Sequence, residues 1–291
     1  MPTFDTPEPI SVTVELGVGD LRIVAGDRTD TTVEVRPSDP AKQADVTAAE
    51  QTRVEYAGGR LLIKTPKSWR QYTWRGGRES VDVQVELPAG SHLRGETGVG
   101  ALRGSGRLGE CHWRTGAGEI QLDQTGPLRL RTGAGDVTVG HAGDAELTVG
   151  SGIVRADRID GTAVVKNSNG DTFIGEVTGD LRVNAANGRI SVDLARAAVT
   201  AKSANGDVRL GEVARGAVVA ETGFGKVEVG VRDGVAAWLD LTTRFGNVSN
   251  DLDAAERPAP GEDAVEVHAR TSFGDVTIHR SFASRTGKDQ P

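Results

Sequence analysis

The chain has 291 residues and a formal net charge of −7, so neither a general nucleic-acid surface nor an anionic-membrane surface is expected. Glycine is abundant, at 39 residues, aromatic residues make up only 4% of the chain, and few stretches look helical. The single cysteine, Cys111, excludes an internal disulfide and fits a reducing compartment.

Residues 1–9 have neither the basic start nor the apolar stretch of a secretory signal. No run approaches the roughly 18 apolar residues that a membrane-spanning helix needs. We therefore expect a soluble, cytoplasmic protein.

Residues 1–95 are expected to form an N-terminal β cap together with the first coils of a repeat structure. Ser38-Asp39-Pro40 followed by residues 41–52 predicts one short helix, because proline suits the first helical turn. Strands are predicted at residues 53–57, 60–65 and 81–87.

A basic and aromatic loop lies within this cap. Residues 60–78 contain six Lys or Arg and no acidic residue. Exposed Trp, Tyr and Arg dominate interaction hot spots, so the candidate interaction residues are Trp69, Arg70, Tyr72, Trp74 and Arg75. The loop could also make weak contact with an anionic surface. The structural alternative is that the aromatics only close the end of the fold while the basic groups are solvated.

Residues 96–282 carry a regular repeat. Segments such as Thr132–Val139 share an aligned glycine, followed by a polar residue and alternating apolar residues. From Gly100 to Gly225 this glycine recurs every 17–19 residues. The aligned glycines are Gly19, Gly100, Gly118, Gly135, Gly152, Gly170, Gly188, Gly206, Gly225, Gly246 and Gly274. A fixed period of this length is typical of stacked repeats, because one unit cannot bury its own apolar face.

The apolar residues within each repeat alternate with period two, which is strand spacing. Each repeat therefore predicts two short strands joined by a tight turn, and stacking them gives an all-β, single-stranded parallel β-helix with coils of about 18 residues. A left-handed hexapeptide helix would need an aliphatic residue at every sixth position. The paired columns here lie about nine residues apart, so we favour a right-handed β-helix.

The position before the aligned glycine predicts ladders of like residues, because equivalent positions of successive coils lie above one another. Three amides and then three rings follow in sequence: Asn169, Asn187, Asn205, Phe224, Phe245 and Phe273. Asn side chains can share hydrogen bonds and Phe rings can stack. We interpret the column as structural ladders, with a ligand-binding stripe as the alternative.

Two departures from the period lie near the C-terminus. Residues 251–263 predict a surface loop, and residues 283–291 predict a disordered tail. The last coil in the sequence, near Phe273–Ile278, has no evident long cap. End-to-end self-assembly through this coil is therefore a further hypothesis.

The repeated turns Thr132–Val139 and Ser203–Val208, together with Leu16–Leu21, resemble those of the bacterial "putative adhesin" family of β-strand-repeat domains, a family of unknown function. The resemblance covers roughly residues 8–280. It implies the β-helix fold and a surface location, and relatedness to cell-envelope stress proteins. It implies no catalytic residues.

The sequence patterns do not favour metal binding or a cysteine nucleophile. An acidic column follows the aligned glycines, yet its spacing differs from that of calcium-binding β-rolls, and turn chemistry explains it better. The five histidines show no metal-ligand spacing. Cys111-His112 resembles a nucleophile pair, but Cys111 falls in an inward apolar column, which indicates an inert thiol.

The sequence thus predicts a non-catalytic interaction or scaffold protein without a cofactor, which binds a protein partner or itself and no nucleic acid. The alternative is a carbohydrate-active β-helix enzyme of the polysaccharide lyase or hydrolase type. Such an enzyme would need acid and base groups converging on one outer face.

Overall fold

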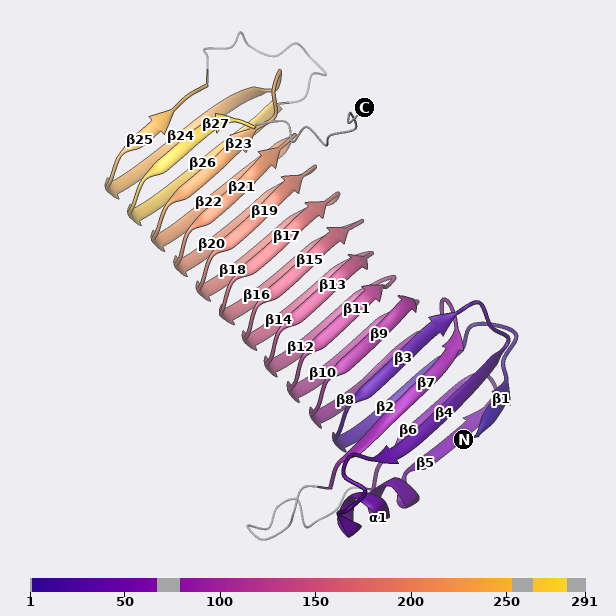
Figure 1. Cartoon of the computed structure of the whole chain (residues 1–291). Helices are drawn as coiled ribbons and strands as arrows, with labels where there is room; N and C mark the ends of the chain where they lie inside the picture. The colour runs from indigo at the N-terminus through magenta and orange to yellow at the C-terminus, as the bar shows by residue number, and fades with distance from the viewer. Residues whose placement is uncertain (1, 67–78, 253–263, 282–291) are drawn as a thin grey trace, which may run out of the picture. The chain divides into compact units, whose positions relative to one another are not determined.

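The computed structural model describes residues 2–66, 79–252 and 264–281 (Figure 1). The chain forms two compact units, unit 1 (residues 1–170) and unit 2 (residues 171–291). In each unit we call the sheet of strands that precede the aligned glycines sheet B, and the sheet of strands that follow them sheet A. The predicted division into a cap at 1–95 and repeats at 96–282 stays a prediction.

Unit 1 contains one helix and 16 strands among its described residues. They are β1 (Thr3–Asp5), β2 (Ser11–Val18), β3 (Leu21–Gly26), β4 (Asp30–Pro37), α1 (Gln43–Gln51), β5 (Arg53–Ala57), β6 (Arg60–Lys64), β7 (Val81–Pro88), β8 (His92–Val99), β9 (Leu102–Arg107), β10 (Cys111–Ala117), β11 (Ile120–Gln124), β12 (Leu128–Ala134), β13 (Val137–Ala142), β14 (Ala145–Ser151), β15 (Val154–Ile159) and β16 (Ala163–Asn169). Sheet A has the order β1-β4-β7-β3-β9-β11-β13-β15, and sheet B the order β5-β6-β2-β8-β10-β12-β14-β16. The predicted β-helix is confirmed.

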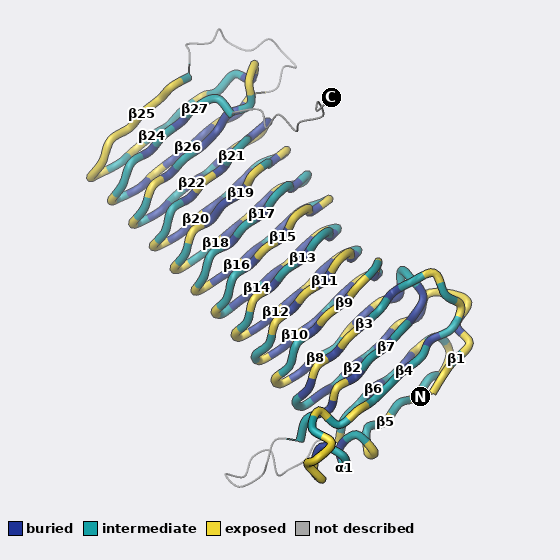
Figure 2. The backbone as a smooth tube through the Cα atoms, viewed as in Figure 1, coloured by how far each residue is buried: buried dark blue, intermediate teal, exposed yellow. Residues whose placement is uncertain are grey.

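The coil formed by β12 and β13 shows why these residues fold this way. Leu128 and Leu130 of β12 and Val137 and Val139 of β13 are buried, and the residues between them face outward. Both strands pair in parallel with the strands of the adjacent coils. Figure 2 shows the resulting alternation of buried and exposed positions along the strands. The core is therefore the layer of apolar side chains between the two sheets.

The turn between β12 and β13 requires Gly135, which has φ +129°. A Cβ atom at this position would lie 2.1 Å from the carbonyl oxygen of Gly118 in the adjacent coil. The same left-handed region is occupied by all eleven aligned glycines. The periodic glycine thus permits both the turn and the close approach of the coils.

The N-terminal end of unit 1 is closed by antiparallel strands. β4 pairs antiparallel with β7 and with β1, and β5 pairs antiparallel with β6. The coil of β6 and β7 lies outside the coil of β2 and β3, although it follows later in the chain. This arrangement confirms the elaborated β cap.

Helix α1 begins at Gln43, two residues later than the Pro40 signal suggested, and its N-cap residue Lys42 makes no side-chain capping bond. The buried carboxylate of Asp45 instead accepts hydrogen bonds from the backbone N–H groups of Asp39 (3.2 Å) and Ser80 (3.0 Å). Asp45 therefore ties the helix to the chain segments flanking β4 and β7. Within the described residues, no helix has the length and apolar character required to cross a membrane.

Unit 2 contains β17 (Thr172–Val177), β18 (Leu181–Asn187), β19 (Ile190–Ala195), β20 (Val199–Asn205), β21 (Val208–Val213), β22 (Gly216–Phe224), β23 (Val227–Val231), β24 (Ala236–Phe245), β25 (Val248–Asn250), β26 (Ala264–Phe273) and β27 (Val276–Arg280). Its sheet A has the order β17-β19-β21-β23-β27-β25, and its sheet B the order β18-β20-β22-β26-β24.

The order of the last two coils of unit 2 differs from their order in the chain. The coil of β26 and β27 is inserted between the coil of β22 and β23 and the coil of β24 and β25. The outermost coil is therefore 236–250, and the expectation that Phe273–Ile278 forms the open coil was wrong. Strand β26 pairs with β22 on one side and with β24 on the other. The predicted surface loop lies outside the described residues from residue 253 on, and so does the predicted tail at 283–291.

Candidate interaction surface

The predicted basic and aromatic loop cannot be placed in the fold. Trp69, Arg70, Tyr72, Trp74 and Arg75 lie outside the described residues, between β6 and β7. Their role in binding stays a prediction.

The three phenylalanines before the aligned glycines form a stack at the turn edge of unit 2. The ring centroids of Phe224 and Phe273 lie 4.7 Å apart at an interplanar angle of 2°, and those of Phe245 and Phe273 lie 4.9 Å apart at 11°. Phe273 is central because the coil order is exchanged. The residues are 56% (Phe224), 63% (Phe245) and 45% (Phe273) exposed. The ladder is thus also an exposed aromatic surface.

The asparagines of the same column lie in both units. In unit 2, Asn187 and Asn205 occupy paired positions of β18 and β20. In unit 1, Asn169 pairs in register with Ser151, and its amide lies 3.5 Å from the carbonyl oxygen of Gly150.

The acidic column after the glycines has a structural use. The carboxylate of Asp136 accepts a hydrogen bond from the backbone N–H of Ile153 in the adjacent coil, at 2.8 Å. Asp20, Asp171, Asp207 and Asp275 bind the corresponding N–H of a neighbouring coil in the same way, at 2.8–3.0 Å. These carboxylates therefore join coil to coil. Among the described residues, no group of three or more His, Cys, Asp or Glu is placed to hold a metal ion.

A second polar column was missed by sequence reasoning. Thr115 and Thr132 are buried three residues before the aligned glycine, and their hydroxyls donate to the carbonyl oxygens of Ala117 (3.2 Å) and Ala134 (3.0 Å). Asn167 occupies the same position, and its amide donates to Gly152 and Gly170. The recurrent Thr of the motif was visible in the sequence, but the carbonyl groups that it satisfies became evident only in the fold.

The outermost coil of unit 2 is open on one side among the described residues. On sheet B, Leu239 and Leu241 point toward the core but are only half-buried, and on sheet A, Val248 is 47% exposed. The equivalent positions of inner coils, such as Val267 and Val276, are fully buried. Trp238 lies on the outer face of β24 and is 59% exposed. We call Phe224, Phe245, Phe273, Trp238 and Val248 the terminal aromatic surface.

A polar cluster holds β24 against β26 beside this surface. Oδ2 of Asp240 accepts hydrogen bonds from Arg270 (2.8 Å) and from Nδ1 of His268 (3.2 Å), while Nε2 of His268 lies 3.0 Å from Glu266. Hydrogen bonds to Asp240, and then to Glu266, raise the pKa of His268. Those from Arg270 and His268 lower the pKa of Asp240. The ring of Trp238 packs edge-on against His268, with centroids 5.5 Å apart.

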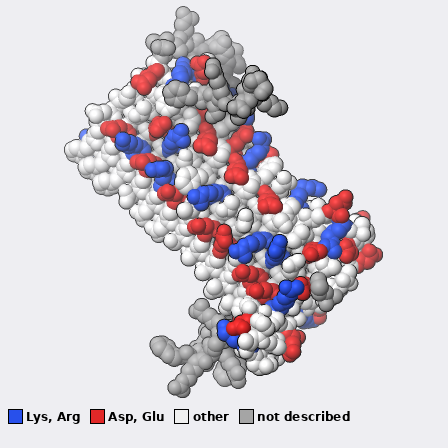
Figure 3. All heavy atoms as spheres, in the orientation of Figure 1, with Lys and Arg blue, Asp and Glu red and all other residues white. Residues whose placement is uncertain are grey.

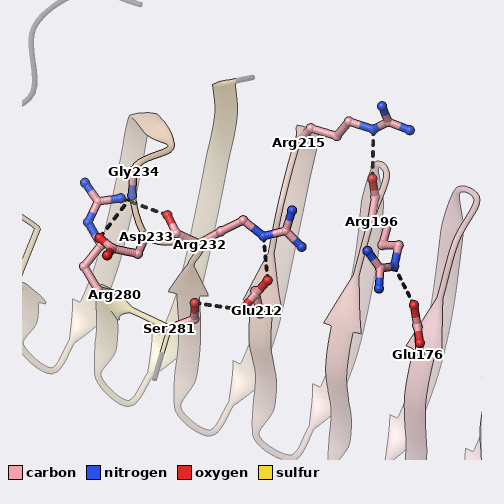
Figure 4. Close-up of polar contacts among 9 residues, drawn as sticks. All are labelled: Glu176, Arg196, Glu212, Arg215, Arg232, Asp233, Gly234, Arg280 and Ser281. Atoms are coloured by element: carbon pink, nitrogen blue, oxygen red, sulfur yellow. Dashed lines mark hydrogen bonds and ion pairs between the residues drawn. The ribbon is translucent and has the colours of Figure 1, made fainter. Parts of the chain in front are cut away.

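A row of arginines follows the opposite turn edge of unit 2 (Figure 4). Arg196 and Arg232 form ion pairs with Glu176 and Glu212. The other two arginines donate to main-chain carbonyl oxygens, Arg215 to Arg196 and Arg280 to Arg232 and Val235. The row ties successive coils together.

On the face shown in Figure 3, basic and acidic side chains are interspersed.

Cys111 lies in the core of unit 1, and its burial raises the pKa of the thiol to about 12. Such a thiol is protonated at neutral pH and is not a nucleophile. The Cys111-His112 pair is therefore not an active site.

These features define a protein of stacked parallel β-coils whose turn edges are held by glycine, carboxylate and threonine columns. The family model Toastrack DUF4097 matches residues 9–279, so the chain belongs to this family. The search of curated proteins found no match.

Two solved structures are similar over most of their length. One is a "putative adhesin" from Bacteroides fragilis, with 13% identity, a TM-score of 0.38, and coverage of 96% of this chain and 95% of that chain. The other is a "putative adhesin" from Parabacteroides merdae, with 8% identity, a TM-score of 0.40, and coverage of 96% and 94%.

Proposed function

We propose that this protein is a non-catalytic interaction scaffold that binds a protein partner through the terminal aromatic surface of unit 2. The observation that carries the proposal is the exposure of three stacked phenylalanines on three adjoining coils, together with that of Trp238 on the outermost of them. Aromatic residues, phenylalanine included, are enriched in the cores of protein interfaces. The three stacked rings form a contiguous exposed apolar surface, and such surfaces are typical of interaction sites.

The remaining polar groups support a scaffold rather than an enzyme. The turn carboxylates accept backbone hydrogen bonds, as Asp136 and Asp207 do, and Cys111 is buried and protonated. Acid–base catalysis needs titratable groups that converge on a substrate position. Groups already committed to joining coils are poorly suited to that task.

The name "adhesin" given to similar proteins agrees with a binding role. We also propose a role linked to cell-envelope stress, which the resemblance to this family suggests. The cytoplasmic location expected from the sequence also stays a prediction, which fractionation of the native cells would test.

Site-specific photocrosslinking in the native cells tests the proposal. A benzophenone amino acid in place of Phe245 is expected to give discrete crosslinked products. The same probe in place of Thr200, on β20 of the same unit, is the matched control. Equal crosslinking at both positions, or none at Phe245, would contradict the proposal.

A further inference from the structure

The outer edge of β24 is the least protected strand edge of the described structure. In unit 1, by contrast, the strands at the outer edges of the two sheets are short: β1 has 3 residues and β5 has 5 residues. Natural proteins shorten edge strands, or place Lys and Pro on them, to prevent pairing with other chains. β24 has 10 residues and contains neither Lys nor Pro. An edge of this length is suited to pairing with another strand.

We propose that two copies of this chain join through their outermost coils, with β24 pairing antiparallel to β24 of the second copy about a two-fold axis at Thr242. The inference rests on the proposed function, since it names a partner for the same end of unit 2. Pairing would satisfy the outward N–H and C=O groups of β24. It would also cover Leu239 and Leu241, which the described residues leave half-buried.

The charged residues of β24 favour a second copy of this chain as the partner, and they favour the register centred on Thr242. With Thr242 on the axis, Asp240 lies opposite Arg244 of the second copy, and the pair occurs twice. Oδ2 of Asp240 binds Arg270 and His268, whereas Oδ1 has no hydrogen-bond partner among the described residues. Arg244 is exposed and forms no ion pair within the described part of the chain. Oδ1 of Asp240 can therefore accept a hydrogen bond from the guanidinium group of Arg244 of the second copy.

Two other registers are disfavoured by like charges. An axis at Asp240 would place two carboxylates directly opposite each other, and an axis at Arg244 would place two guanidinium groups opposite each other. In the register centred on Thr242, Arg244 of the second copy also lies diagonal to the exposed ring of Trp238. Long side chains reach across such diagonals, and a guanidinium over an indole ring adds a cation–π contact.

Light scattering and sedimentation of the full chain over a concentration series test the inference. We expect the mass to rise from 30.5 kDa to twice that value and to stop there. A mass that stays at 30.5 kDa, or one that climbs beyond twice 30.5 kDa, would overturn a closed two-fold dimer.

Charge reversal tests the register. Arg244→Glu places two carboxylates opposite each other, and Asp240→Arg places two guanidinium groups opposite each other. Each variant alone is expected to dimerise at least about tenfold more weakly than the unmodified chain. An equimolar mixture of the two variants is expected to form a heterodimer, because every substituted side chain then faces an opposite charge.

Circular dichroism confirms that each variant is folded. Because Asp240→Arg also loses the contact with Arg270, the double variant Asp240→Arg/Arg244→Asp provides a second measurement, and it is expected to dimerise with itself. The register would be overturned if neither charge reversal weakened dimerisation. It would also be overturned if the variants were folded but dimerised neither in the equimolar mixture nor as the double variant. If the chain is a monomer but the probe at Phe245 still crosslinks a different protein, the scaffold function stands and only the dimer fails.

Discussion

At the scale of single residues, the columns of like residues have a common cause. Each coil repeats the same turn, so Gly135 meets the carbonyl of Gly118, and Asp136 reaches the N–H of Ile153. A residue at one of these positions therefore serves its own turn and the contact with the next coil together. This double use explains why the glycine is kept in every repeat while the residue before it varies from Val to Asn and Phe.

We expect Gly135→Ala to lower the free energy of unfolding by more than about 2 kcal/mol, because a Cβ atom would meet the Gly118 carbonyl and because φ +129° strains any L side chain. Gly26→Ala is the matched control. A Cβ atom at Gly26 would have no atom within 4 Å, and its expected effect is within about 0.5 kcal/mol. Urea denaturation of both variants checks the prediction, and equal effects would contradict it.

At the scale of elements, the attachment of β24 to β26 depends on charged side chains as well as on the strand ladder. His268 lies between Asp240 of β24 and Glu266 of β26, so its protonated form binds both carboxylates. Because the pKa of His268 is raised in the folded state, its contribution to stability is fully present below the ordinary value of 6.5. That contribution is lost as the pH rises through the raised pKa.

An NMR titration of the His268 ring is expected to give a pKa above 6.5. Asp240→Asn should lower this pKa more than Glu266→Gln does, because the hydrogen bond to Asp240 is the larger cause of the shift. A larger effect of Glu266→Gln, or no effect of Asp240→Asn, would show that the cluster is arranged differently.

At the scale of the whole molecule, the described parts of the two units differ in how their stacks end. Unit 1 closes its N-terminal end with antiparallel strands and α1, whereas β24 and β25 of unit 2 have a neighbouring coil on one side only. In stacked repeats, each coil is stabilised mainly by its nearest neighbours. The outermost coil of unit 2 is therefore expected to open locally more often than the inner coils.

Hydrogen–deuterium exchange at low protein concentration should show faster exchange of the amides of β24 than of those of β20 and β22. Raising the protein concentration should slow exchange in β24 selectively, because dimerisation covers its outer edge. Uniform exchange across the strands of unit 2 at low concentration would contradict the expected weakness of the outermost coil.

The fold could be predicted from the sequence to the level of single strands. The strands at 53–57, 60–65 and 81–87 match β5, β6 and β7 closely, and the aligned glycines mark the turns. The terminal aromatic surface was harder to predict from the sequence. The phenylalanine column was visible as a repeat, but the exposure of its rings and the central place of Phe273 depend on coil order, which the sequence does not encode locally.

The sequence by itself determined the coil: its length of about 18 residues, its glycine turn, and its inward apolar columns. These features follow from short-range rules of alternation and turn geometry that act within one repeat. Only the tertiary structure decided which coils are neighbours. The coil 264–280 lies between the coil of β22 and β23 and the outermost coil 236–250, so β24 has an open edge. The turn carboxylates accept hydrogen bonds from the neighbouring coil. Each of these outcomes depends on contacts between residues far apart in the chain.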